Sequence, residues 1–198
     1  MISAKFLFMS FYTLNYIMYG SIFIYLGALI PYYSEEAGVS ESEFTILLMA
    51  KGIGYILGGF MKVKVLKNID LHKGLILSNI GSGICSIMMA MTYHKLTLTF
   101  ITFVSSICLY FTHILVNTAF MRRGSEDVKL YMTLSYISIN LGCGLGPFLI
   151  SYFGISACII LGGVVFCFGI AYIFLPHFPD QISTKENKGK TNEISEQS

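Results

Sequence analysis

The residues of this chain best suited to chemistry are polar side chains inside long hydrophobic segments. The segment from Leu98 to Met121 is the clearest case, because Ser106, Tyr110, His113 and Asn117 recur in it at helical spacing. Offsets of four, seven and eleven residues put these side chains on one face of a helix. A polar face is costly against lipid, so we expect it to face protein or a water-filled cavity.

His113 has two interpretations, a hydrogen-bonded packing residue or a proton carrier. No second ligand stands at a spacing suited to zinc, so we expect no metal site and no cofactor. The sequence also lacks a nucleophile–base pair and a glycine-rich phosphate loop beside soluble structure. We therefore expect that the protein is not an enzyme.

Lys51 places an ionisable group inside the hydrophobic segment from Phe44 to Leu66. Gly54 and Gly58 follow on the same helical face and form a GxxxG pair typical of close helix packing, and Tyr55 lies beside them. Lys51 could extend its ammonium group to the membrane surface. Alternatively, it is a cation that faces a cavity and pairs with a neighbouring helix or a substrate.

Amides mark two other hydrophobic segments. Asn15 in the first segment could form an interhelical hydrogen bond or line a cavity. Tyr136 and Asn140 share one face of the fifth segment. We include these three residues with Lys51, Tyr55, His113 and Asn117 as candidate solute-binding residues.

The fifth segment also carries a second GxxxG pair, Gly142 and Gly146, directly followed by Pro147. We expect the glycines to pack against another helix. Pro147 removes a backbone donor and is expected to kink its helix.

Composition shows which elements must position these residues. Hydrophobic residues make up 55% of the chain and charged residues 12%, and the net charge of +2 is too small to suggest nucleic-acid binding. A helix needs about 20 apolar residues to cross a bilayer, and such segments must be helical to satisfy their backbone groups in lipid. Six segments qualify: Phe6–Tyr32, Phe44–Leu66, Gly74–Tyr93, Leu98–Met121, Leu130–Phe153 and Gly154–Leu175. The sequence predicts an all-α, multi-pass membrane protein surrounded by a lipid bilayer.

The connections between these segments predict orientation and boundaries. Lysines and arginines concentrate on the side that carries both termini, so we expect both termini on the cytoplasmic or equivalent side. We expect residues 1–176 to form the membrane domain and the polar residues 177–198 to be a disordered tail on that side. Before the second segment, Ser40 can cap the helix and Glu43 can close a capping box.

The six segments divide into two groups of three. In each group, the first helix has an amide-containing polar stripe, the second has a GxxxG pair, and the third is rich in small residues. Three helices per group give the two groups opposite directions in the membrane. Inverted three-helix repeats of this kind build each six-helix half of a major facilitator transporter.

Individual motifs also resemble that superfamily. The stretch LGALIPYYSEEAGVSESEFTILLMAKGIGYILGG resembles the first two helices of its sodium-dependent glucose transporter-like subgroup, with Lys51-Gly52-Ile53-Gly54-Tyr55 in place of an Arg-Gly-x-Gly-Tyr-like segment. Asn117-Thr118 and the glycine-rich stretch 141–147 also fit. One departure is the loop after the second helix, which has no acid before Asp70.

The resemblance implies an N-terminal six-helix half whose first and fourth helices line a central cavity. It also implies transport of glucose or a related hexose with sodium by alternating access, together with a second six-helix half (a second copy or a separate chain). The residues themselves suit a small polar solute such as a hexose. Lys51 leaves an organic anion as a rival solute. A non-transporting subunit of a larger membrane complex is the alternative function.

Overall fold

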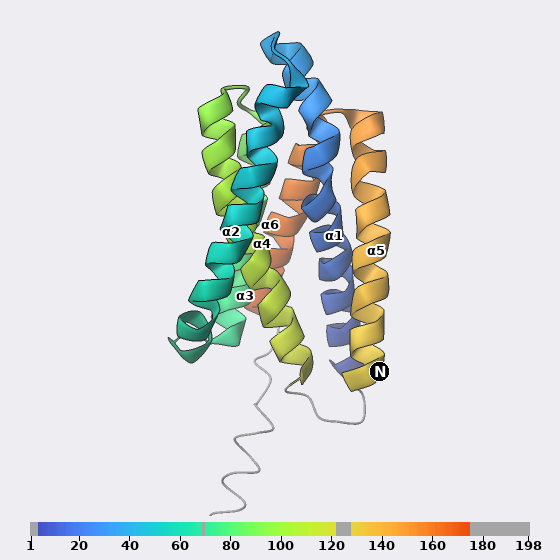
Figure 1. Ribbon diagram of the computed structural model, residues 1–198. Helices are drawn as coiled ribbons and strands as arrows, with labels where there is room; N and C mark the ends of the chain where they lie inside the picture. Colours follow the sequence, from blue (N-terminus) through green and yellow to red (C-terminus); the bar gives the residue numbers. More distant parts are fainter. Residues whose placement is uncertain (1–3, 69, 122–127, 175–198) are drawn as a thin grey trace, which may run out of the picture.

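The computed structural model describes residues 4–68, 70–121 and 128–174, and the described part of the chain is a bundle of six helices (Figure 1). The side chains of residues 4–9, 62–68, 120 and 128 are outside the description. The helices are α1 (Ala4–Ala37), α2 (Glu41–Asn68), α3 (Leu71–Ala90), α4 (Lys95–Met121), α5 (Val128–Phe153) and α6 (Ser156–Phe174). The predicted all-α architecture is confirmed.

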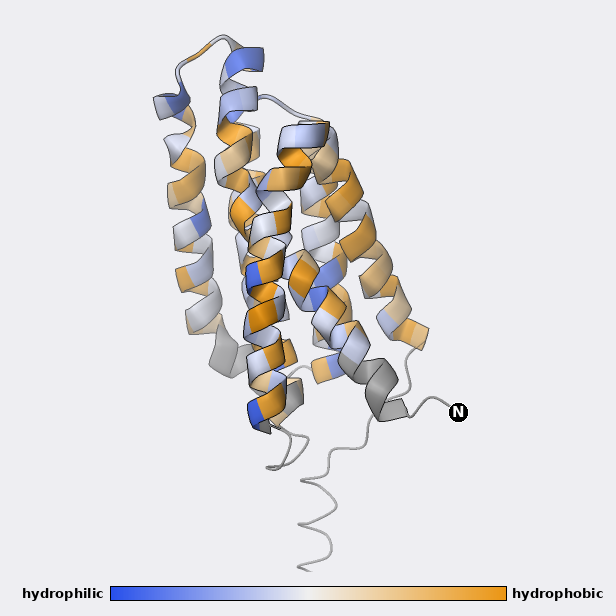
Figure 2. Cartoon of the chain, turned by 90° about the vertical axis from the view of Figure 1, so that its right-hand side faces the viewer, coloured by the Kyte–Doolittle hydropathy of each residue, from blue (hydrophilic) through white to orange (hydrophobic). Residues whose placement is uncertain are grey.

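All six helices are long and apolar enough to cross a membrane, and hydrophobic residues extend along each of them (Figure 2). The chain is therefore a multi-pass integral membrane protein. The starts of α1, α3 and α5 lie at the same end of the bundle as the ends of α2, α4 and α6 (Figure 1). The predicted tail, 177–198, lies outside the described residues, and the cytoplasmic side of the bundle stays a prediction.

The helices pack most extensively in four pairs: α1 with α5, α3 with α6, α2 with α4, and α3 with α4. If α1, α2 and α3 are exchanged with α4, α5 and α6, in that order, the α1–α5 pair becomes the α4–α2 pair. The same exchange leaves the α3–α6 pair unchanged. These three pairs follow the pattern that two three-helix repeats produce. The α3–α4 pair departs from it, because its counterpart under the exchange, α1–α6, is in much less extensive contact.

Glycines bring the backbones of each pair close together. A Cβ atom on Gly54 would lie 2.6 Å from the carbonyl oxygen of Phe103 in α4, and one on Gly83 would lie 2.8 Å from that of Gly162 in α6. A Cβ atom on Gly142 would collide with the carbonyl oxygen of Ile17 in α1. Similarly, Gly58 lies against Tyr110, and Gly146 lies against Ser21. Small residues at the contacts let membrane helices approach this closely.

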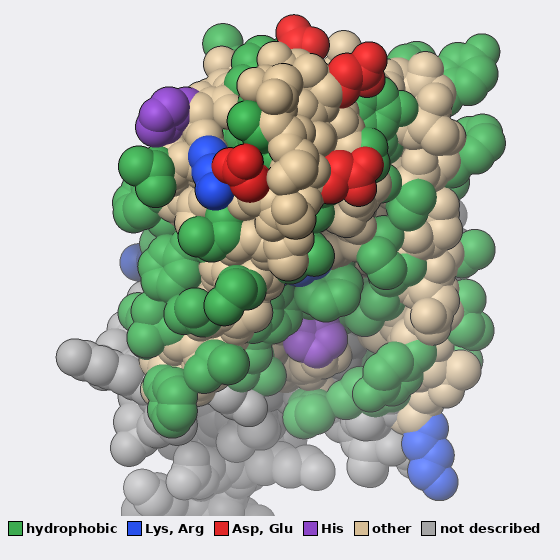
Figure 3. Space-filling view, turned by 45° about the horizontal axis from the view of Figure 1, so that its top comes forward, with side chains coloured by type: hydrophobic (Ala, Val, Ile, Leu, Met, Phe, Trp, Pro, Cys, Tyr) green, Lys and Arg blue, Asp and Glu red, His purple; other side chains and the backbone are tan. Residues whose placement is uncertain are grey.

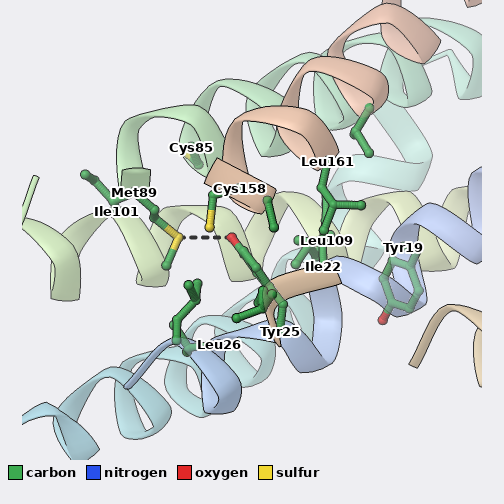
Figure 4. Close-up of a cluster of buried hydrophobic side chains, with 14 of the residues drawn as sticks. Tyr19, Ile22, Tyr25, Leu26, Cys85, Met89, Ile101, Leu109, Cys158 and Leu161 are labelled. Atoms are coloured by element: carbon green, nitrogen blue, oxygen red, sulfur yellow. Dashed lines mark hydrogen bonds between the residues drawn. The ribbon is translucent and has the colours of Figure 1, made fainter. Parts of the chain in front are cut away.

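The centre of the bundle is filled by side chains of α1, α3, α4 and α6 (Figure 4). Tyr25 of α1 is 2% exposed, and its hydroxyl lies 3.1 Å from the sulfur of Met89 and 3.3 Å from the hydroxyl of Ser86. The neighbouring cysteines, Cys85 and Cys158, are buried and not in disulfide bonds. They serve as small packing residues, as their positions in apolar segments suggest.

Helix ends differ from the sequence expectations at several points. Pro31 lies inside α1, which continues to Ala37, beyond the predicted end at Tyr32. Helix α5 runs through Pro147 and ends at Phe153, as predicted. The expected capping box before α2 is wrong, because the Glu43 carboxylate pairs with Lys95 of α4 at 3.4 Å. Ser40 does precede the helix, but its hydroxyl contacts that of Ser42.

Asp70 has a clear local role. Its carboxylate accepts a hydrogen bond of 2.8 Å from the backbone amide of His72 and caps the N-terminus of α3. The helix therefore begins at Leu71, one turn before the apolar segment read from the sequence, because a negatively charged cap is favourable at a helix N-terminus.

The α1–α5 contact makes a testable prediction. Gly142→Ala places a methyl group against the α1 backbone, which cannot rotate away as a side chain can. We expect it to reduce the free energy of unfolding by about 1–3 kcal/mol. The measurement is thermal unfolding of the full chain in detergent, followed by circular dichroism.

Gly144→Ala is the matched control, because a Cβ atom at Gly144 meets nothing within 4 Å. The added methyl group raises helix propensity, so the midpoint of unfolding should stay the same or increase. Equal effects of the two substitutions would contradict the close α1–α5 contact.

Candidate functional site

Aromatic rings gather where α1, α2 and α4 meet, on the side of the bundle away from the α3–α6 pair. We call Tyr16, Tyr19, Phe23, Tyr55 and Tyr110 the aromatic cluster. The ring of Tyr55 lies 5.4 Å from that of Phe23 and 5.8 Å from that of Tyr110, both edge to face. Tyr19 stacks on Phe23 at 6.0 Å. Because the spacing of Tyr16, Tyr19 and Phe23 is three and four residues, one face of α1 supplies three of the five rings.

A chain of hydrogen bonds borders the cluster on α4. The hydroxyl of Tyr16 lies 2.6 Å from Oδ1 of Asn117, to which it donates, and 3.2 Å from the carbonyl oxygen of His113. The amide nitrogen of Asn117 lies 3.1 Å from Nε2 of His113. If the amide donates there, the ring carries its proton on Nδ1. That nitrogen is buried without a hydrogen-bond partner among the described residues.

Two polar contacts join α1 and α2 at this site. The hydroxyl groups of Tyr19 and Tyr55 form a hydrogen bond. One turn earlier on α2, Lys51 donates to the carbonyl oxygen of Phe23, and its ammonium nitrogen lies 4.0 Å from the centre of the Phe23 ring. Cation–π attraction adds to the hydrogen bond. Lys51 therefore points toward a neighbouring helix and not toward the membrane surface.

The fifth helix borders the site more loosely. Tyr136 and Asn140 are exposed, and the Asn140 amide donates to the backbone oxygen of Tyr136 at 2.8 Å. Next to Tyr19, the backbone of Cys143 in α5 packs against Gly20 of α1. The face that α1, α2, α4 and α5 share is recessed below the acidic end of the bundle (Figure 3).

Asn15 lies elsewhere. It is 2% exposed, and its amide nitrogen is 3.0 Å from Oδ1 of Asn79 in α3 and 3.3 Å from the hydroxyl of Tyr172 in α6. The structure thus links four of the seven candidate residues, Lys51, Tyr55, His113 and Asn117, through the aromatic cluster, and leaves Tyr136 and Asn140 exposed on α5. It places Asn15 elsewhere, where it joins α1, α3 and α6.

Sequence reasoning left Tyr16, Tyr19 and Phe23 out of the candidate site. The signal was their spacing on the first helix: Tyr19 shares a face with Asn15, but only the amide was taken as a candidate. A helix that is buried on nearly all sides has no polar stripe that marks the functional side, so only its neighbours distinguish the faces.

The aromatic cluster contains no carboxylate. The described acidic residues lie at helix ends: Glu35, Glu36, Glu41, Glu43 and Asp70. Hydroxyl, amide, imidazole and aromatic groups, with one ammonium group, make up the described site. Such a set can form hydrogen bonds to a neutral polar molecule and stack against its apolar faces.

Comparison with known proteins agrees with this arrangement. The family model described as Major Facilitator Superfamily matches residues 11–196. The chain belongs to the major facilitator superfamily. Its six helices are consistent with one half of that fold, and the family consists of membrane transporters and not of enzymes. A search of curated proteins found no match, and no specific subgroup is supported.

The contact between Tyr16 and Asn117 can be measured by a double-mutant cycle. We expect Tyr16→Phe and Asn117→Ala to be less than additive, with a coupling free energy of about 0.6 kcal/mol and at most about 1.7 kcal/mol, as for other membrane hydrogen bonds. The measurement is the free energy of unfolding of the full chain in mixed micelles.

The control cycle combines Tyr16→Phe with Ser151→Ala. Ser151 bonds a carbonyl of its own helix, near the end of α5, and should show no coupling to Tyr16. A coupling energy of zero for Tyr16 and Asn117 would mean that their hydrogen bond does not form in the membrane.

Proposed function

We propose that this transporter domain moves a small, neutral, hydroxyl-rich solute such as a hexose by alternating access. The observation that carries the proposal is the aromatic cluster and its polar border on α4. Sugar-binding sites need ring faces against which the apolar side of the solute can stack, and hydrogen-bond groups at the edges. The ring of Tyr55 and the amide of Asn117, which are linked through Tyr19 and Tyr16, supply the two kinds of group.

The roles of the side chains follow from their chemistry. The Tyr19–Tyr55 hydroxyl pair can exchange its mutual hydrogen bond for bonds to a solute. The imidazole of His113 contacts the amide of Asn117 and orients that amide at the border of the cluster. Tyr136 and Asn140 lie exposed at the border, where they can meet the solute as it enters.

Alternating access further requires a second six-helix half, either a second copy of this chain or a separate chain. Transporters of this type bind solutes near the membrane midplane and between repeats, and they expose the site to either side by rocking one unit against the other. The recessed face of α1, α2, α4 and α5 is where we place the second half. The described residues of this face offer no carboxylate to couple solute movement to protons or sodium.

The experiment is solute uptake into proteoliposomes, made from the complex that the full chain forms in its membrane after mild detergent extraction. We expect saturable hexose uptake. Tyr55→Phe and Asn117→Ala should each lower uptake efficiency by about two- to tenfold, the effect of losing one hydrogen bond.

The control is Tyr152→Phe, which removes a tyrosine hydroxyl from an exposed position on α5, 77% accessible and distant from the cluster. Its uptake should equal that of the unmodified protein. Uptake of organic anions but not of hexoses would show that the solute is an organic anion and not a hexose. No uptake of either, together with recovery of the chain in a stable stoichiometric complex, would favour a non-transporting subunit.

A further inference from the structure

The accessible surface of α2 divides along the helix into two flanks of different chemistry. One flank is apolar and exposed, and it consists of Met49, Ile53, Ile56, Leu57 and Phe60. The other, which we call the α2 flank, is interrupted by glycines and a threonine and consists of Thr45, Leu48, Gly52, Tyr55 and Gly59. Nothing lies within 4 Å of a Cβ atom placed on Gly52. An apolar flank suits contact with lipid, whereas bare glycines suit contact with another helix.

The accessible surface of α5 divides in the same way. Its apolar flank consists of Ile137, Leu141, Leu145 and Phe148. Its other flank, which we call the α5 flank, consists of exposed residues that are polar or small: Thr133, Tyr136, Asn140, Gly144 and Ser151. A Cβ atom on Gly144, like one on Gly52, has nothing within 4 Å.

Asn140 shows that the α5 flank needs a cover of protein. The residue is at the middle of α5 (Val128–Phe153), and so close to the middle of the membrane. Its bond to the backbone oxygen of Tyr136 uses one N–H of the amide and leaves the second N–H and Oδ1 for another partner. Polar groups at this depth face protein or a water-filled cavity. In either case, protein must separate the α5 flank from lipid.

The two flanks face the same side of the bundle. At about 100° per residue, each flank lies about 100–200° past the glycine that contacts the neighbouring helix, Gly54 on α2 and Gly142 on α5. The two helices run in opposite directions at opposite edges of the bundle, with α4 and α1 between them (Figure 1). The same turn therefore brings both flanks to the side of the aromatic cluster, to which Tyr55 belongs.

We propose that this surface binds a second copy of the chain, related to the first by a two-fold axis parallel to the helices. The inference rests on the proposed function, which requires a second six-helix half, and it identifies that half. A half-turn about such an axis exchanges the two edges of the bundle, so the α2 flank of each copy meets the α5 flank of the other. One contact, made twice, covers both flanks and closes the assembly at two copies.

Depth in the membrane favours this pairing. Gly52 lies about 16 Å from the start of α2 and Gly144 about 14 Å from the end of α5, at 1.5 Å per residue. The start of α2 and the end of α5 are at the same end of the bundle (Figure 1). The two open glycines therefore meet at one depth, where they let α2 and α5 of different copies approach closely.

Charge is also compatible with contact between identical surfaces. Residues 45–61 and 133–153 contain one charged side chain, that of Lys51. Its ammonium group is directed to the carbonyl oxygen and the ring of Phe23 within its own chain. Two copies therefore meet along these flanks without repulsion between like charges.

The test is disulfide cross-linking in membranes that contain two differently tagged forms of the full chain, one with Gly52→Cys and the other with Gly144→Cys. Both forms also carry substitutions that remove the cysteines that are not fully buried: Cys108→Ala, Cys143→Ala and Cys167→Ala. We expect a cross-linked dimer with both tags, because a disulfide forms only between Cα atoms within about 7 Å of each other.

The matched control is the pair Ile53→Cys and Leu141→Cys. These positions lie at similar depth on the apolar flanks, and each side chain is 56% exposed. Its cross-linking should be lower by about tenfold or more, because these positions face away from the two-fold contact. Equal cross-linking of the two pairs would overturn the proposal, as would recovery of the chain in a one-to-one complex with a different protein.

Gly144→Leu tests the contact without a cysteine. The first atom added there meets no other part of the described chain, so the helices of one copy should stay folded by circular dichroism. The dissociation constant of the dimer in mixed micelles should rise about tenfold or more, the effect of overpacking a close contact. Leu141→Phe adds bulk on the apolar flank and should leave it unchanged within about twofold.

These measurements do not depend on transport. A dimer without solute uptake would contradict the proposed function and leave the two-fold contact in place. Hexose uptake by a complex that holds one copy of the chain would contradict the two-fold contact and leave the proposed function in place.

Discussion

Close approach of helix backbones in pairs is the constraint on which the rest of this bundle depends. Gly142 lets α5 lie directly on α1, Gly54 does the same for α2 on α4, and Gly83 for α3 on α6. In lipid there is no hydrophobic driving force between helices, so van der Waals contact and interhelical hydrogen bonds must hold them together. Once the backbones are this close, polar groups such as Tyr16 and Asn117 reach each other across the helices.

The packing of the helices also divides the polar residues into two groups with different roles. Asn15 joins α1 to α3 and α6 in a buried contact with Asn79 and Tyr172. Beside Asn15 on α1, Tyr19 faces α2 and α4 instead, and its hydroxyl meets that of Tyr55. One side is thus closed by satisfied hydrogen bonds. The other side holds the hydroxyl, imidazole and ammonium groups where we propose that the solute binds.

Lys51 connects the packing of the helices with the charge at the candidate site. A lysine in a membrane helix is costly unless it has a partner, and here a backbone carbonyl and the ring of Phe23 provide one. The contact directs the ammonium group away from lipid and toward the interior. It therefore links the stability of the α1–α2 contact to the electrostatics of the candidate site, where the described residues hold no carboxylate to balance the charge.

The sequence by itself determined the membrane class, the six helices and the three-helix repeat, because apolar length and residue spacing depend on local composition. It also placed the polar stripe of His113 and Asn117 on one helical face. Only the tertiary structure decided which face of α1 meets α4, and so separated Asn15 from the aromatic cluster. It likewise paired Glu43 with Lys95 in place of a capping box. Spacing along one helix defines its faces, but the neighbour that each face meets is decided by packing between helices distant in the chain.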